Sequence, residues 1–141
     1  MITLIYHSVA LNICSEEKLN LFLTSVRRKN IRLNITGVLL YHRRNILQII
    51  EGENDTIYEL IERIKIDNRH TDVVKLVDFK ITKRSYVGWS MAFKQLSKKD
   101  WMKVKGYLNI ETEESLVPQY SDKSCYLKVL INSFIYENNL I

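Results

Sequence analysis

The chain has 141 residues, a formal net charge of +5, a hydrophobic fraction of 46% and a charged fraction of 26%. These values are typical of one soluble globular domain, and no apolar run approaches the about 18 residues that a membrane-spanning helix needs. The first residues contain neither a basic leader nor a long apolar block, and two cysteines without metal-ligand spacing, Cys14 and Cys125, favour a reduced, cytoplasmic protein.

The first predicted elements are a strand and an amphipathic helix. Residues 2–8 alternate as in a strand and place Tyr6 on the same face as two aliphatic side chains. Ser15 is a preferred helix N-cap, and the two glutamates after it suit the positive end of the helix dipole. The apolar stripe of this helix, at spacings i, i+3, i+4 and i+7, consists of Leu19, Phe22, Leu23 and Val26. We expect the helix to end near Lys29 and Asn30.

Two strands joined by a short link follow the first helix. Residues 35–41 and 46–50 are rich in aliphatic residues, and the link at residues 42–45 has the length of a hairpin turn. The second strand contains Gln48 within the run ILQIIEG, which then enters a charged turn. An unpaired amide inside such a strand would cost about 1–3 kcal/mol. The sequence therefore predicts a specific hydrogen-bonding partner for Gln48.

A second helix and two more strands are predicted next. Asn54 or Asp55 is expected to cap the helix. Its apolar stripe, at the same spacings as in the first helix, consists of Ile57, Leu60, Ile61 and Ile64. Residues 73–81 and 89–95 have the composition of the fourth and fifth strands.

The remaining chain is predicted to be helical, over residues 98–108 and 124–136. The element order βαββαββ followed by helices predicts a ferredoxin-like α+β sandwich. Both interleaved helices should cover one face of the sheet, and the C-terminal helices the other. We therefore expect a domain of residues 1–96 and a C-terminal helical extension of residues 97–141, packed as one compact unit.

Sequence signatures of catalysis are mostly absent. The four glycines form no phosphate-binding loop, the serines lack a nucleophile-elbow context, and the three histidines show no metal-ligand spacing. We therefore expect no metal site and no hydrolytic centre. Basic clusters at residues 27–32, 43–44 and 98–105 lack the interleaved aromatic residues of a nucleic-acid platform, which favours a solvated surface.

Polar residues instead occupy positions where a buried core is expected. If the first and third strands are neighbours, Tyr6 and Gln48 lie side by side and face the helices. Asn30 lies at the end of the first helix, and four polar residues gather at the end of the second: Arg63, Asp67, Arg69 and His70. Taken singly, these residues could be a satisfied core pair, a helix cap and a solvated turn. Taken together, they indicate a cleft between the two helices.

Five motifs occur in order along the chain: LIYHS (4–8), NITGVLLY (34–41), ILQIIEGE (46–53), IKIDNRHTDV (64–73) and GWSM (88–91). Together they resemble the motifs of a BLUF domain, a blue-light receptor that uses flavin adenine dinucleotide (FAD). The resemblance extends to Gln95. It implies a βαββαββ fold with the flavin between the two helices. It also implies FAD as the cofactor, with FMN or riboflavin as the alternatives.

The resemblance implies a role for individual residues. Tyr6 looks like the tyrosine that reduces the excited flavin, Gln48 like the glutamine between that tyrosine and the flavin ring, and Asn30 like the asparagine at the flavin carbonyl edge. The polar cluster near the ribityl and phosphate end would be Arg63, Asp67, Arg69 and His70. The ring would be walled by Phe22, Ile46 and Ile64. The pair in the fifth strand that passes the signal on would be Trp89 and Met91.

This chain departs from the family at two positions. Lys29 stands where the family often has asparagine or histidine, and His7 follows the tyrosine where small residues are common. Neither departure touches the pair of Tyr6 and Gln48.

The expected function is that of a light sensor without enzymatic activity, because few residues follow the sensor region. Its output would go to a separate protein or to a homo-oligomer, through the fifth strand and the C-terminal helices. One alternative is a hydrolase of the acylphosphatase type, but the sequence lacks a phosphate-binding loop after the first strand. A basic nucleic-acid-binding module is the other, against which stands the lack of aromatic pairs on the sheet.

Overall fold

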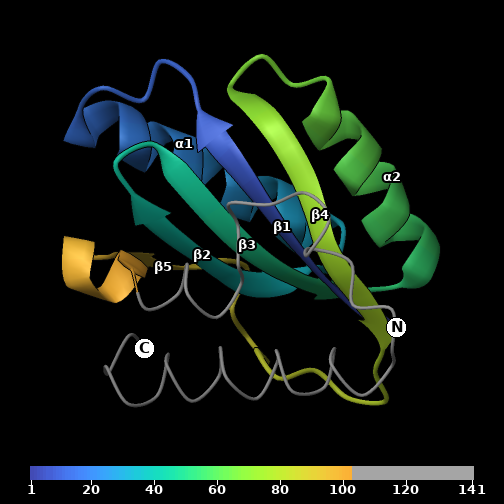
Figure 1. Ribbon diagram of the computed structural model, residues 1–141. Helices are drawn as coiled ribbons and strands as arrows, with labels where there is room; N and C mark the ends of the chain where they lie inside the picture. Colours follow the sequence, from blue (N-terminus) through green and yellow to red (C-terminus); the bar gives the residue numbers. More distant parts are fainter. Residues whose placement is uncertain (103–141) are drawn as a thin grey trace.

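The computed structural model describes residues 1–102 and contains a five-stranded sheet with two long helices (Figure 1). The elements in chain order are β1 (Ile2–Ala10), α1 (Glu16–Arg32), β2 (Thr36–His42), β3 (Asn45–Gly52), α2 (Asn54–Lys65), β4 (His70–Lys80) and β5 (Ala92–Gln95). Residues 98–102 are also helical. Each element predicted for this part of the chain is present, although several bounds differ. The rest of the helix predicted over residues 98–108, the helix predicted over residues 124–136 and Cys125 lie outside the described residues.

The strand order of the sheet is β4-β1-β3-β2-β5, so the first strand lies in the interior. β1 is antiparallel to both β3 and β4, whereas β2 is antiparallel to β3 and parallel to β5. α1 therefore connects β1 to β2 across β3, and α2 connects β3 to β4 across β1. These two interlocked units confirm the predicted ferredoxin-like α+β fold.

The two faces of the sheet carry two separate apolar cores. The inner core packs both helices on one face, because alternate strand residues meet the apolar stripes of α1 and α2 (Figure 1). Its buried helical members are Leu19, Phe22, Leu23, Ile57, Leu60, Ile61 and Ile64. The outer core, on the opposite face, contains Leu47 and Ile49 of β3. The prediction that both helices share one face is therefore confirmed.

α1 begins where the sequence predicts and ends later. The Ser15 hydroxyl accepts a hydrogen bond from the backbone N–H of Lys18 at 3.2 Å, which confirms the N-cap. At the other end, the N–H of Leu33 still donates to the carbonyl of Lys29 at 3.1 Å, so the helix continues past its predicted end. Asn30 is therefore an interior helical residue instead of a C-cap, and it is buried at 2% exposure.

α2 begins one residue before its predicted start. Its N-cap is Glu53, which makes no side-chain capping hydrogen bond. The prediction of Asn54 or Asp55 as the cap is wrong, because the N–H of Ile57 donates to the carbonyl of Glu53 at 2.9 Å and closes the first turn earlier.

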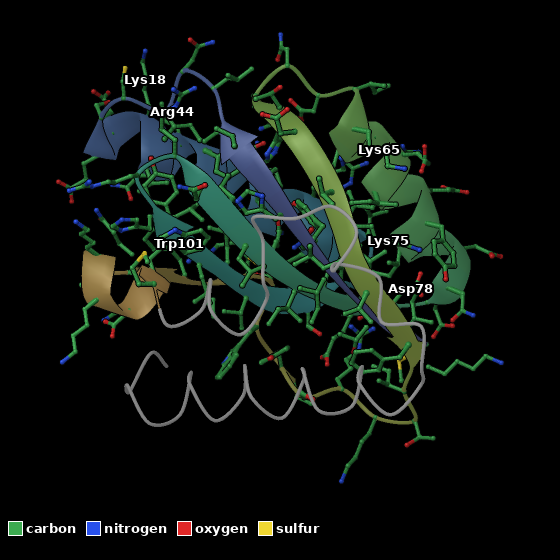
Figure 2. All side chains as sticks on the ribbon, in the orientation of Figure 1. Lys18, Arg44, Lys65, Lys75, Asp78 and Trp101 are labelled. Carbon is green, nitrogen blue, oxygen red and sulfur yellow. The ribbon has the colours of Figure 1, made fainter. Side chains whose placement is uncertain are left out.

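The solvent side of α2 is tied to β4. The hydroxyl of Tyr58 donates to Asp78 Oδ2 at 3.0 Å, and Lys75 Nζ donates to the same oxygen at 2.9 Å. Figure 2 shows Lys75 and Asp78 on β4, beside α2. Since these side chains are partly exposed, the ion pair contributes no more than about 1 kcal/mol.

The hairpin between β2 and β3 has a tighter turn than the predicted link. Only Arg43 and Arg44 lie between the strands, with φ angles of 43° and 73°. Two positive φ angles define a type I′ turn, which matches the twist of the paired strands. The turn is also bound to the end of β1, because the N–H of Ala10 donates to the carbonyl of Arg44 at 2.7 Å.

β4 and β5 begin at other residues than the sequence predicts. β4 begins at His70, which pairs with the end of β1, so this residue belongs to a strand and not to a solvated turn. β5 begins at Ala92, after the predicted start at Trp89. The reason is a sharp turn: Gly88 has a φ angle of 81°, and the N–H of Trp89 donates to the carbonyl of Tyr86 at 3.2 Å.

The helical residues 98–102 lie against the outer face of the sheet. Ser97 caps them, because its hydroxyl accepts from the N–H of Asp100 at 3.1 Å. Trp101 stacks against two histidine rings, with its centroid 6.1 Å from that of His7 and 6.0 Å from that of His42. Among the described residues, no helix is both long and apolar enough to cross a membrane.

Candidate functional site

The buried pair predicted from the sequence is present. Tyr6 of β1 and Gln48 of β3 lie directly opposite each other in the antiparallel register. Both are buried, at 1% and 3% exposure, and both face the helices. The Tyr6 hydroxyl donates to Gln48 Oε1. Gln48 therefore has the partner that its position in an apolar strand requires.

The other end of the Gln48 amide meets a sulfur atom. Gln48 Nε2 donates to Met91 Sδ at 3.6 Å, and a thioether is a weak acceptor. Met91 belongs to the inner core, whereas Trp89 packs on the outer face, where its ring stacks on Tyr86 at a centroid distance of 6.0 Å. The prediction that both residues lie in the fifth strand is wrong. They lie in residues 81–91, which we call the β4–β5 connection.

Helix α1 holds the end of the β4–β5 connection. Asn30 Nδ2 donates to the carbonyl of Ser90 at 2.6 Å, and Arg27 Nε donates to the carbonyl of Met91 at 2.9 Å. Since these two carbonyls are bound to a helix, they do not pair in the sheet, and this explains why β5 begins only after Met91.

A narrow cleft between α1 and α2 brings most of the predicted residues together. Its free volume is about 30 Å³. It is lined by Tyr6, Phe22, Ser25, Val26, Lys29, Asn30, Gln48, Leu60, Ile64, Asp67, Arg69 and His70.

Two of the predicted flavin-binding residues lie outside this lining. Ile46 is fully buried in the inner core behind the cleft. Arg63 lies on the surface of α2, 3.9 Å from Glu59, and lines a neighbouring hollow that it shares with Lys29. The sequence reasoning did not assign Ser25, Val26 or Leu60 to the site. Val26 and Leu60 could have been found from the apolar stripes of their helices, whereas nothing in the sequence pattern marks Ser25.

A larger hollow lies elsewhere in the molecule. It has a volume of about 450 Å³ and lies at the start of α1, beside β2 and β5, with Cys14, Tyr41 and Phe93 among its lining residues. It contains none of the predicted site residues. We place the functional site in the narrow cleft, because the buried donors and acceptors of Tyr6, Asn30 and Gln48 converge there.

An ion pair lies at the mouth of the cleft. The Arg69 guanidinium donates to both oxygens of Asp67, with Nη2 at 2.6 Å from Oδ2 and Nε at 3.0 Å from Oδ1. These hydrogen bonds lower the pKa of Asp67 to about 2, so its carboxylate is charged at neutral pH. The same guanidinium lies over the ring of Phe22, 5.3 Å from the centroid, and so closes the cleft on that side.

His70 lies deeper, beside β1. Its Nδ1 is 3.1 Å from the Ser8 hydroxyl, and its ring meets the Phe22 ring edge-on at a centroid distance of 5.5 Å. Burial lowers the pKa of His70, and the nearby Asp67 carboxylate opposes this shift in part. The imidazole is therefore neutral at neutral pH and shares one hydrogen bond with Ser8.

The Tyr6 phenol is held in its neutral form. Burial raises its pKa far above the ordinary value of 10.0, the Asp67 carboxylate raises it further, and Arg69 acts in the opposite direction. A neutral phenol can donate the hydrogen bond to Gln48 at every physiological pH.

We expect Tyr6 to stay protonated in the folded protein at pH values where an unperturbed phenol ionises. The phenolate absorbance of the wild type and of a Tyr6→Phe variant should coincide through the pH range around 10.0, because residue 6 does not titrate there in the folded protein. The unfolded chain does lose this proton, so the stabilising effect of the neutral phenol is complete below pH 10 and decreases above it. A one-tyrosine difference between the two titrations below the alkaline unfolding transition would contradict this expectation.

The residues of the cleft fit a flavin by their chemistry. The amides of Asn30 and Gln48 provide donors and acceptors for a polar ring edge, and Phe22, Leu60 and Ile64 provide apolar walls. A free volume of about 30 Å³ is far below the about 300–1,000 Å³ of a typical ligand pocket, so a flavin ring enters only when the lining side chains move apart. No group of three or more His, Cys, Asp or Glu side chains in residues 1–102 could hold a metal ion.

The fold is that of a small ferredoxin-like α+β domain with a polar cleft between its two helices. The family model for BLUF, described as sensors of blue-light using FAD, matches residues 1–92. The chain therefore belongs to the BLUF family of blue-light sensors. This result favours neither the acylphosphatase-type hydrolase nor the nucleic-acid-binding module.

Curated relatives are light-regulated proteins with much longer chains. Photoactivated adenylate cyclase subunit beta of Euglena longa is 38% identical over 84 residues, which are 60% of this chain and 10% of the relative. The blue light- and temperature-regulated antirepressor BluF of Escherichia coli K12 is 28% identical over 75 residues, which are 53% of this chain and 19% of the relative. The chain thus matches between a tenth and a fifth of the length of these two proteins.

Solved structures of similar size have the same fold. The ground state of BlsA superposes with a TM-score of 0.70 at 26% identity and covers 95% of this chain and 87% of that one. The dark state of BlrB, a BLUF protein, superposes with a TM-score of 0.65 at 28% identity and covers 78% and 82% of the two chains.

Proposed function

We propose that Tyr6 and Gln48 are the photochemical pair of this blue-light sensor and that the cleft between α1 and α2 binds FAD. The observation that carries the proposal is the buried hydrogen bond from the Tyr6 hydroxyl to Gln48, whose other end contacts Met91. The Tyr6 hydroxyl, the reversible Gln48 amide and Met91 of the β4–β5 connection thus form one continuous series of contacts. FMN or riboflavin would contact the same residues, because the amides of Asn30 and Gln48 would bind only the flavin ring, which all three cofactors share.

When bound, the flavin supplies the absorption of blue light and accepts an electron. Asn30 and Gln48 would hold the polar edge of its ring, and Phe22 and Ile64 its flat faces. Asp67, Arg69 and His70 would meet the chain that extends from the ring towards the mouth of the cleft. Ile46 would support Phe22 and Ile64 from the inner core. Arg63 would stand at the outer rim, beside Lys29.

In the proposed light reaction, Tyr6 transfers an electron and a proton, and the Gln48 side-chain amide changes its orientation. Tyr6 gives up an electron, and its phenolic proton passes to Gln48 Oε1, with which it already shares a hydrogen bond. Return of both to Tyr6 leaves the Gln48 amide reversed, by rotation or by tautomerisation. A reversed amide turns an acceptor towards Met91 Sδ where it had presented a donor, so that contact is lost.

The signal leaves the cleft through the β4–β5 connection. One altered hydrogen bond is worth about 0.5–1.5 kcal/mol, which biases a two-state packing and does not unfold a domain. We propose that this bias acts on β5 and the extension of residues 97–141. The chain itself would not catalyse a reaction and would act, in the cytoplasm, on a separate partner protein or through a homo-oligomer. The relatives named as a cyclase and as an antirepressor illustrate two outputs of related light-regulated proteins.

The test is the colour and light response of the purified protein. It should be yellow, should absorb slightly further to the red after blue light, and should revert in the dark. The flavin should be non-covalent, because Cys14 lies at the start of α1, outside the cleft. Acid should therefore release all of it. A colourless protein that takes up no added flavin would refute the proposal, and flavin retained on the denatured chain would refute non-covalent binding.

A further inference from the structure

The proposed light reaction makes no use of the buried carboxylate of Glu51. This residue is 0% exposed, although the sequence pattern places it in a charged turn. It lies on β3, an odd number of residues from Gln48, and therefore faces the outer side of the sheet. Its partners across the two neighbouring strands are Thr3 and Thr36, whose hydroxyls each donate to the carboxylate at 3.4 Å.

The stronger partners of Glu51 are backbone groups at the start of the β4–β5 connection. The N–H of Ser85 lies 3.0 Å from each carboxylate oxygen, and the N–H of Tyr86 lies 3.1 Å from Oε2. Arg84 adds a second attachment, since Nη1 donates to the Glu51 carbonyl at 2.8 Å and Nη2 to the Asn34 carbonyl at 2.7 Å. Charge-assisted bonds of this kind are stronger than those between neutral groups.

The end of the same connection is held by different groups. Asn30 and Arg27 of α1 bind the carbonyls of Ser90 and Met91, and Gln48 contacts Met91 Sδ. Within residues 1–102, Gln48 thus contacts the end of the β4–β5 connection and not its start. The two ends of the connection are therefore attached to opposite faces of the sheet.

A short turn joins the two ends. The rings of Tyr86 and Trp89 stack at a centroid distance of 6.0 Å and an interplanar angle of 24°, and a backbone hydrogen bond of 3.2 Å closes the turn between them. The N–H of Gly37 on β2 also donates to the carbonyl of Trp89 at 3.0 Å. Residues 86–89 are therefore held by several contacts and can absorb little of a movement at Met91.

We infer that Glu51, assisted by Arg84, is a positioning residue that anchors the start of the β4–β5 connection. Because the start is fixed, a change of the contact between Gln48 and Met91 is not absorbed within the connection and passes forward into β5 and residues 98–102. The inference rests on the proposed light-driven change at Gln48 and assigns to Glu51 the transmission of that change, not its generation.

The test uses the full chain with bound flavin and compares Glu51→Gln, Arg84→Gln and Lys83→Gln. A glutamine at position 51 has one acceptor oxygen, and its NH₂ group opposes the backbone donors. Lys83 is exposed and adjacent to Arg84, so its variant is a control with the same change in charge as Arg84→Gln. Hydrogen exchange is measured for each protein in the dark and under blue light, together with the flavin spectrum.

The light-minus-dark difference separates transmission from stability, because a purely structural loss raises exchange equally in both states. Glu51→Gln and Arg84→Gln should keep the spectral shift, and their exchange difference over residues 92–102 should fall by about twofold or more, within the range that mutations have on coupling. Lys83→Gln should behave as the wild type. If Glu51→Gln does not fold, Arg84→Gln decides the question, because it leaves the buried carboxylate and its backbone donors in place.

Two results in the anchor variants would overturn the inference. One is a light-minus-dark exchange difference over residues 92–102 as large as that of the wild type, in whichever of the two anchor variants fold. The other is loss of the spectral shift itself, which would place Glu51 in the photochemistry. A wild type that shifts its spectrum without any exchange change in residues 81–102 would also overturn it, while leaving light sensing intact. A wild type without flavin or spectral shift would instead refute the proposed function.

Discussion

A Tyr6→Phe variant should bind flavin as the wild type does and lose the light-induced spectral shift. Phenylalanine keeps the buried ring of residue 6 in the inner core and removes only the hydroxyl that donates to Gln48. Without this group, the chain loses the donor of the electron that the flavin accepts and the proton that passes to the Gln48 amide. The freed Gln48 oxygen is buried, so the variant should also lose about 1–3 kcal/mol of stability. Absorption spectra before and after blue light measure the first effect, and urea unfolding the second.

The matched control is Tyr41→Phe. Tyr41 is also a buried tyrosine of the inner core, but it lies on β2 and lines the larger hollow instead of the cleft. This variant should keep the full spectral shift. A normal light response in Tyr6→Phe would instead show that another side chain is the donor, with Trp89 as the first candidate.

A Gly37→Ala substitution should destabilise the fold more than Gly52→Ala does. A Cβ atom at this position would lie 2.1 Å from the carbonyl oxygen of Ile49 and 3.2 Å from the Cα of Ile50. Both atoms belong to the backbone of β3, which cannot yield without moving Gln48. We expect a loss on the order of 3 kcal/mol. For a chain of this length this corresponds to a decrease in Tm on the order of 10 °C, measured by circular dichroism.

Gly52→Ala is the control for this substitution. Its Cβ would meet Cδ1 of Ile57 at 3.2 Å and Cγ1 of Ile35 at 3.4 Å, and these side-chain atoms can shift. The expected cost is below about 1 kcal/mol. Equal destabilisation by the two substitutions would show that β2 and β3 separate more easily than their register suggests.

The sequence predicted the fold well where structure follows from local periodicity. The apolar stripes of α1 and α2 and the alternation in β1 and β3 depend on nearby residues, and together they determine which side chains face inward. The pairing of Tyr6 with Gln48 followed from this alternation once the strand order was assumed. The N-cap at Ser15 was predicted for the same reason, because capping involves residues three positions apart.

The sequence failed where the conformation depends on distant partners. The β4–β5 connection has no periodic pattern, and its path is set by Asn30, Arg27 and Glu51, which come from other elements. Trp89 and Met91 were therefore placed in a strand, and their separation onto opposite faces could not be foreseen. Glu51 was assigned to a charged turn for a similar reason, because the threonines and backbone N–H groups that satisfy it lie far away in the sequence.

The position of β5 has a consequence for how this kind of domain can evolve. Within residues 1–102 the strand is short, lies at the edge of the sheet and pairs with β2, whereas the strand that carries Tyr6 lies in the interior. A terminal strand can be exchanged, lengthened or fused to new sequence without rearranging the four strands that hold the cleft. In the curated relatives, the matched region makes up between a tenth and a fifth of the protein. An edge strand that follows the strands of the cleft offers one junction at which new sequence can be joined without rearranging them.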